Sequence, residues 1–84
     1  MSTTRKVLIA DDEPDILEII QFNLQQEGYN VVTAKNGDEA IEKAKKTNPE
    51  LIILDIMMPG KNGIEVCNVL RMMPDFKETL IIFL

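Results

Sequence analysis

The sequence predicts an α/β fold, an open parallel sheet with strand order 2-1-3-4 and the connectivity (βα)3β. Two observations lead to this prediction. Short apolar runs alternate with amphipathic helical segments along the 84 residues, which is the pattern of parallel strands joined by helical crossovers. Two of these runs, residues 7–10 and 51–54, end directly in aspartates. Ligand sites of open α/β sheets lie at the carboxyl ends of strands, so the acids favour placing these two strands side by side.

The first strand and the first helix are expected at residues 7–10 and about 14–27. The strand is a short apolar run that suits burial on both faces. Acids followed by Pro14 are typical of a helix N-terminus, and Gly28 is a suitable C-terminal stop. Leucines and isoleucines at helical spacing give this helix one apolar face.

The second strand and helix follow a similar pattern. Residues 29–34 are β-rich but more polar, which predicts an edge strand. The turn at residues 36–38 leads into a helix, with Asp38 as the expected N-cap. The helix should end at Asn48, because the residue before Pro49 avoids helical backbone.

The third strand, residues 51–54, is fully apolar and leads into Asp55 and a loop rich in glycine and proline. A third helix is expected from about residue 64 to 73, ended by Pro74. The last apolar strand occupies residues 79–84. We expect residues 1–84 to form one domain, since so short a chain supports a single core.

Composition restricts the possible functions. Fourteen acidic against nine basic residues give a net charge of −5, which argues against a nucleic-acid-binding surface in this segment. No apolar run approaches the ~20 residues needed to span a bilayer, so no membrane partner is expected. One cysteine and no signal peptide suggest a cytoplasmic protein. Because histidine is absent, a histidine-ligated zinc site and a Ser-His-Asp triad are excluded within the chain.

Three carboxylates form the candidate site. Asp11 and Asp12 follow the first strand and Asp55 follows the third. Each has an ordinary alternative, because an aspartate before a helix is often only an N-cap and one after a strand is often only a turn residue. Their joint occurrence, with no basic residue nearby to pair them, favours a site for a divalent cation such as Mg2+. An aspartate beside such an ion is a suitable nucleophile towards phosphorus.

Two motifs resemble those of response-regulator receiver domains. They are Val-Leu-Ile-Ala-Asp-Asp-Glu-Pro at residues 7–14 and Leu-Ile-Ile-Leu-Asp-Ile-Met-Met-Pro-Gly at residues 51–60, followed by Asn62-Gly63. The resemblance runs from about Arg5 to the last residue. It implies the flavodoxin-like, chemotaxis-type fold and a role in two-component signalling.

The resemblance also implies roles for single residues. Asp55 would be the phosphoacceptor, with a phosphohistidine of a sensor histidine kinase as the donor. The helix expected from Pro14 would form much of the kinase-docking face. Magnesium would be held by Asp12 directly, Asp11 through water, Asp55 and the backbone carbonyl of Met57. The loop below the site would be shaped by Pro59, Gly60 and Gly63, whose glycines can take positive φ and allow close backbone approach.

The chain departs from the family at its end. A complete receiver has five strands and five helices, whereas this sequence ends at strand four, before the family's switch hydroxyl, its lysine and its switch aromatic. We therefore expect a truncated receiver whose phosphorylation is impaired. The last strand would leave an apolar sheet face and an open edge uncovered, so we expect a homo-oligomer.

The sequence leaves two other functions to consider. The first is an association module, in which the truncated receiver assembles without phosphotransfer. The second is a phosphatase of the haloacid dehalogenase type, which uses an Asp-x-Asp pair after its first strand. Asp11 and Asp12 are adjacent instead, so this enzyme is disfavoured. No independent enzymatic turnover is expected.

Overall fold

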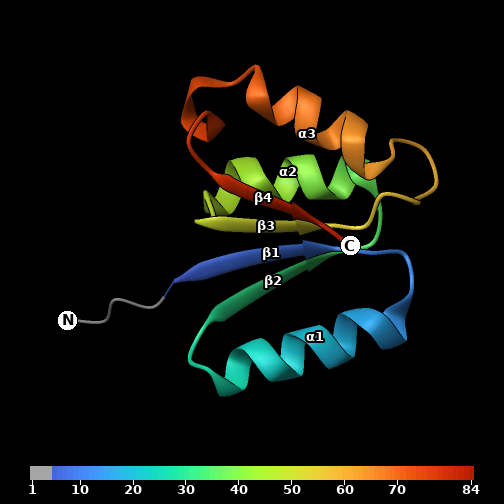
Figure 1. Cartoon of the computed structure of the whole chain (residues 1–84), viewed down its shortest axis with the longest axis vertical. Helices are drawn as coiled ribbons and strands as arrows, with labels where there is room; N and C mark the ends of the chain where they lie inside the picture. Colours follow the sequence, from blue (N-terminus) through green and yellow to red (C-terminus); the bar gives the residue numbers. More distant parts are fainter. Residues whose placement is uncertain (1–4) are drawn as a thin grey trace.

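The computed structural model describes residues 5–84, and its elements follow the predicted order (Figure 1). The predicted domain, residues 1–84, includes residues 1–4, which lie outside the described part. The strands are β1 (Lys6–Ala10), β2 (Asn30–Ala34), β3 (Leu51–Leu54) and β4 (Leu80–Phe83). The helices are α1 (Pro14–Gln26), α2 (Gly37–Thr47), α3 (Gly63–Arg71) and the short 3-10 helix η1 (Pro74–Phe76).

The four strands form one parallel sheet in the order β2-β1-β3-β4, which confirms the predicted order and makes β2 an edge strand. The register aligns the carboxyl ends of the strands, because Ala10 pairs with both Ala34 and Leu54. The residue that follows each of the two central strands is an aspartate, Asp11 after β1 and Asp55 after β3. The sheet therefore brings these acids together at the carboxyl ends of its two central strands.

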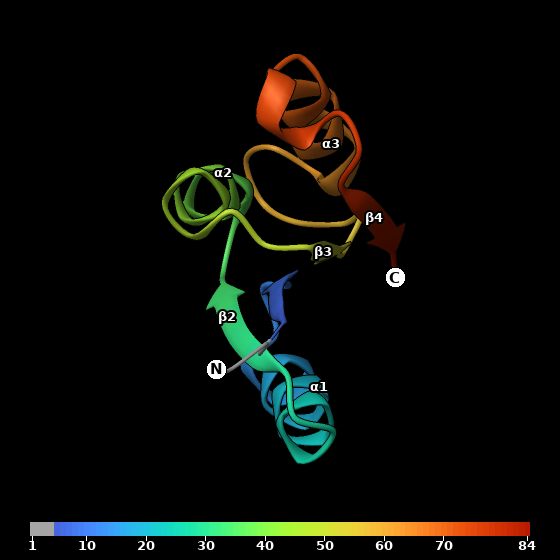
Figure 2. The same cartoon turned by 90° about the vertical axis from the view of Figure 1, so that its left-hand side faces the viewer.

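The helices divide between the two faces of the sheet, α1 on one side and α2 with α3 on the other (Figure 2). Alternate residues of β1 contact the two layers. Leu8 and Ala10 are buried in the cluster with α2 and α3, whereas Val7 and Ile9 are buried with Leu17 of α1. This arrangement confirms that the first strand is buried on both faces and explains its continuous apolar sequence.

Two predicted helix boundaries differ from the structure. Asn36, and not Asp38, is the N-cap of α2, since its side-chain oxygen accepts a hydrogen bond from the Glu39 amide at 2.8 Å. Helix α2 begins earlier than expected, and Asp38 lies in its first turn. Helix α3 ends at Arg71, before the predicted residue 73. Arg71 extends its guanidinium to backbone carbonyls of the following segment, including that of Phe76 at 2.7 Å.

Strand β3 is well covered on one face only. Ile52 and Leu54 are fully buried against the α2 and α3 layer, but Leu51 and Ile53, on the α1 side, are only partly buried. The cause is the position of α1, which contacts β1 and the edge strand β2. Burial on both faces needs cover from two layers, and the described residues supply only one over β3 and β4.

Candidate metal centre

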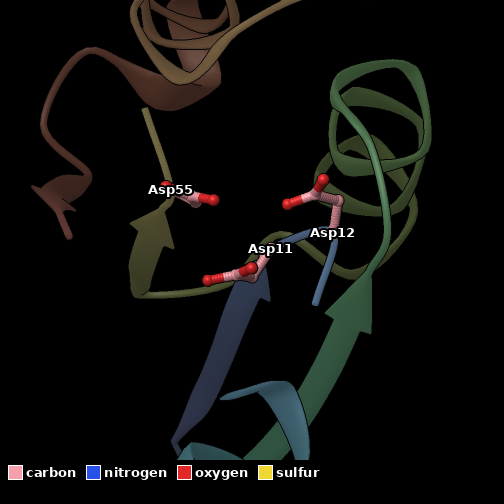
Figure 3. A group of neighbouring side chains, drawn as sticks. All are labelled: Asp11, Asp12 and Asp55. Atoms are coloured by element: carbon pink, nitrogen blue, oxygen red, sulfur yellow. The ribbon is translucent and has the colours of Figure 1, made fainter. Parts of the chain in front are cut away.

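The three predicted acids converge at the carboxyl ends of β1 and β3. Carboxylate oxygens of Asp11, Asp12 and Asp55 all lie within 4.8 Å of one another. Figure 3 shows these side chains directed towards one shared space from the ends of the two strands. The adjacency of β1 and β3 causes this convergence, since Asp55 donates its backbone N–H to the carbonyl of Ala10 at 2.9 Å. Residues distant in the sequence thus form one acidic cluster.

The acids differ in environment. Asp11 is buried, with 4% of its surface exposed, whereas Asp12 is exposed and Asp55 is partly buried. Asp11 Oδ1 accepts a hydrogen bond from the Glu13 amide at 2.9 Å. This bond closes a turn before α1, but the N-cap residue of α1 is Glu13, which makes no side-chain capping bond. Helix capping therefore does not account for the aspartate pair.

The electrostatics of the cluster are unfavourable without a cation. Burial raises the pKa of Asp11 above its ordinary value, and the negative charges of Asp55 and Asp12 raise it further, while the Glu13 amide acts in the opposite direction. Among residues 5–84, the two ion pairs lie elsewhere, Lys43 with Glu39 and Lys61 with Asp38. The carboxylates thus repel one another with no basic partner in the described chain.

The loop after Asp55 folds back over the strand end. The Met57 amide donates to Asp55 Oδ1 at 3.2 Å, and the amides of Met58 and Gly63 both donate to the carbonyl of Ile56. The side chain of Met58 is buried and anchors the loop, whereas that of Met57 is 80% exposed. The backbone around Met57, whose carbonyl would be a metal ligand by the resemblance to receiver domains, is therefore held beside the carboxylate.

The glycines of this loop serve different physical needs. Gly60 has a φ of +74°, a left-handed backbone that other residues adopt only with strain, and nothing lies where its Cβ would be. Gly63 is limited by space instead, because a Cβ there would lie 2.5 Å from the backbone oxygen of Asp55. Pro59 precedes Gly60 in the exposed part of the loop. Only a glycine at position 63 lets α3 begin against the carbonyl of Asp55.

One contributor was not predicted from the sequence. Asn62 is the N-cap of α3 and forms a reciprocal capping box with Glu65, in which each side chain accepts the other's backbone N–H at 2.9 Å. The sequence carried a signal for it, namely a capping residue with glutamate three positions later. The box fixes the end of the loop that leads from Asp55 to α3.

The donor set fits magnesium. Mg2+ prefers a few hard oxygen ligands and keeps several of its waters, and three carboxylates at the edge of a sheet supply such oxygens beside solvent. A divalent cation would also remove the repulsion that raises the pKa of Asp11. Asp11, Asp12 and Asp55 are therefore the residues of this chain that could hold the ion.

Comparisons with known proteins identify relatives. Residues 7–84 match the sequence profile of the response regulator receiver domain. The alkaline phosphatase synthesis transcriptional regulatory protein PhoP of Bacillus subtilis is 49% identical over 67 residues, which cover 80% of this chain and 28% of that protein. The chain thus corresponds to a minor part of that relative's length.

Solved structures agree with this match. The chemotaxis response regulator CheY4 of Vibrio cholerae superposes with a TM-score of 0.94 at 40% identity, covering 96% of this chain and 68% of that chain. Response regulator TrrA of Thermotoga maritima, in complex with Mg2+ and BeF, gives a TM-score of 0.79 at 46% identity, covering 82% of this chain and 60% of that one.

A complex of the histidine kinase ThkA with TrrA also matches, with a TM-score of 0.86 at 44% identity, covering 95% of this chain and 67% of that one. No helix among residues 5–84 is both long and apolar enough to cross a membrane. The profile match spans nearly the whole chain, and the fold agrees with it throughout. This chain therefore belongs to the response regulator receiver domain family.

Proposed function

We propose that this chain is a phosphoacceptor domain in which Asp55 receives a phosphoryl group from a histidine kinase in the presence of Mg2+. The observation that carries the proposal is the convergence of three carboxylates within 4.8 Å at the ends of β1 and β3. Asp55 is only partly buried, so it is accessible to a donor. The Mg2+ and BeF bound to the relative TrrA support the choice of metal.

The transfer is a simple displacement at phosphorus. A carboxylate oxygen of Asp55 attacks the phosphorus of a phosphohistidine, a P–O bond forms, and the P–N bond breaks with its electron pair returning to the imidazole nitrogen. Asp12 would ligate magnesium directly, Asp11 through a water, and the backbone carbonyl of Met57 would complete the protein ligands. Magnesium supplies neutralisation of charge on the transferring group. We propose no further turnover for this domain.

A sensor histidine kinase is the proposed partner. A relative, TrrA, has been solved in complex with the histidine kinase ThkA. Helix α1 lies next to the acidic cluster and exposes apolar side chains, with Ile19 59% and Phe22 61% exposed. This surface suits a helical partner, whereas the net charge of −5 disfavours nucleic acid. We propose a cytoplasmic setting, because a single cysteine suits a reducing compartment, and a single domain over residues 1–84.

The test is intact-mass analysis after incubation with acetyl phosphate, with and without Mg2+. We expect one Mg2+-dependent phosphoryl adduct that is absent from Asp55→Ala and retained in Asp75→Ala, an exposed aspartate in η1 at the other end of the strands. Since no basic residue pairs with the cluster among residues 5–84, slow labelling is expected. Equal labelling of wild type and Asp55→Ala would refute the proposal.

A second candidate function, self-association, has its own supporting observation. Among residues 5–84, strand β4 pairs with β3 alone, and three of its four side chains are exposed, Leu80 at 60%, Ile82 at 43% and Phe83 at 40%. An open apolar edge of this kind favours pairing with another chain. We propose that these 84 residues form a homo-oligomer through the β4 region. Sedimentation at micromolar concentration tests this, and a folded monomer would refute it.

A further inference from the structure

We infer that Gly37, the first residue of α2, is a positioning residue for the metal-binding loop between β3 and α3. It acts by having no side chain, which lets the loop pack directly against the start of α2. The inference rests on the proposed function, because it concerns the loop that carries the backbone of Met57. It adds to the site a residue that lies on another element, helix α2.

The space around Gly37 is closed. A Cβ at this position would lie 2.5 Å from the backbone oxygen of Lys61, 2.7 Å from the Lys61 Cβ and 3.0 Å from Cγ2 of Val66. Real Cβ atoms do not approach neighbours closer than about 3.0 Å. Among the glycines of the described chain, only Gly28 and Gly60 have a positive φ, so the φ of Gly37 is not positive. Position 37 therefore needs glycine for space and not for backbone freedom.

This contact acts on the middle of the loop. The start of the loop is held by the bond from the Met57 amide to Asp55, and its end by the capping box of Asn62. Between these points, Lys61 is held by its contact with Gly37 and by an ion pair with Asp38 at 2.9 Å. The side chain of Asp38 is 79% exposed, and exposed ion pairs contribute little to stability. The packing against Gly37 is thus the main restraint there.

Helix α2 is the firmer of the two contacting parts. Its N-terminus is capped by Asn36, and Ala40 and Ala44 are fully buried in the core between the helix and the sheet. An added methyl group at position 37 would therefore displace the loop by about half an ångström rather than move the helix. Magnesium demands ligands at about 2.0–2.1 Å in near-octahedral geometry, so such a displacement near Met57 would weaken binding.

The experiment compares Gly37→Ala with Gly28→Ala in the 84-residue chain. Gly28 has a φ of +93° and nothing within 4 Å of its Cβ position, so its substitution strains the backbone at the end of α1 without reaching the loop. Mg2+ affinity is measured by calorimetric titration. Backbone amide signals of Met57 and Met58 are measured by NMR in EDTA, which reports on the loop without metal.

We expect Gly37→Ala to lower Mg2+ affinity about tenfold, the size of effect seen when supports of metal ligands are removed, and to shift both amide signals. Gly28→Ala should do neither, although both variants lose stability. Unchanged affinity and unchanged amide signals in a folded Gly37→Ala chain would overturn the inference. Failure of the wild type to bind Mg2+ would refute the proposed function instead, and the metal-free amide signals would still decide the positioning role.

A second pair of variants serves if Gly37→Ala does not fold. Lys61→Gly removes the Cβ that packs on Gly37, whereas Lys61→Ala retains it and loses only the ion pair with Asp38. We expect weaker Mg2+ binding in Lys61→Gly than in Lys61→Ala. Equal affinities in these two variants would overturn the inference.

Discussion

Replacing Asp11 with asparagine should stabilise the metal-free chain and weaken its Mg2+ binding. The carboxylate of Asp11 is buried and lies within 4.8 Å of oxygens of Asp12 and Asp55. At that distance one pair of unit charges repels by about 3.5 kcal/mol at an effective dielectric of about 20, and by about 0.9 kcal/mol in water. Asparagine keeps an oxygen for the Glu13 amide, so the capping of the turn is retained.

The expected gain lies between these limits. Asp12 is exposed, so its repulsion is close to the value in water, whereas Asp55 is partly buried and repels more strongly. We expect Asp11→Asn to raise the free energy of unfolding by about 1–3 kcal/mol in EDTA, or Tm by about 4–8 °C for each kcal/mol in a domain of this size. In saturating Mg2+ the order should reverse, because the wild type gains more from the ion.

Urea unfolding followed by circular dichroism at low salt measures both conditions. Folding raises the pKa of Asp11, so the folded chain binds that proton more tightly than the unfolded chain does. Above the raised pKa, Asp11 is charged and the wild type is destabilised by the full repulsion within the cluster. As the pH falls through that pKa, Asp11 takes up a proton and the wild type regains stability relative to Asp11→Asn. An Asp11→Asn chain that is less stable than wild type in EDTA at pH 7 would refute the reasoning.

Three further outcomes are expected. Asp12→Ala should weaken Mg2+ binding at least about tenfold by calorimetry, whereas Asp75→Ala, distant from the cluster, should leave it unchanged; equal titrations would remove Asp12 from the ligand set. Gly63→Ala should lower the free energy of unfolding in urea by about 1–3 kcal/mol, because its Cβ clashes with the carbonyl of Asp55, and it should also weaken Mg2+ binding. Gly60→Ala should lower the free energy of unfolding by about 1–2 kcal/mol through backbone strain alone. Ile82→Lys, on the exposed β4 strand, should shift sedimentation towards the monomer, and an unchanged oligomer would place the interface elsewhere.

Several features were predictable because local chemistry decides them. The apolar run of β1 required burial on both faces, and the sheet supplies it. Gly28 adopts the positive φ expected of a helix stop, and Asn48 ends α2 before Pro49 in a left-handed conformation. The adjacency of β1 and β3 was predicted from the acids, since it brings Asp11 and Asp55 together.

The errors arose where neighbours in space override local preference. Asp38 has a suitable side chain for an N-cap, but Asn36 takes that position and Asp38 pairs instead with Lys61 from a distant loop. Burial likewise depends on neighbours in space: the apolar sequence of β3 resembles that of β1, yet Ile53 is only partly buried, because α1 contacts mainly β1 and β2. An apolar sequence shows that a strand is compatible with burial, whereas the position of the helices determines which of its faces are buried.

The sequence by itself determined the alternation of strands and helices, the parallel sheet and the identity of the acidic residues, because each depends on periodicity and on single side chains. The tertiary structure decided which glycines are required and why. Gly60 needs backbone freedom, whereas Gly37 and Gly63 need the absence of a Cβ against carbonyl oxygens of Lys61 and Asp55. Such contacts depend on how the chain folds back on itself, so no local sequence pattern records them.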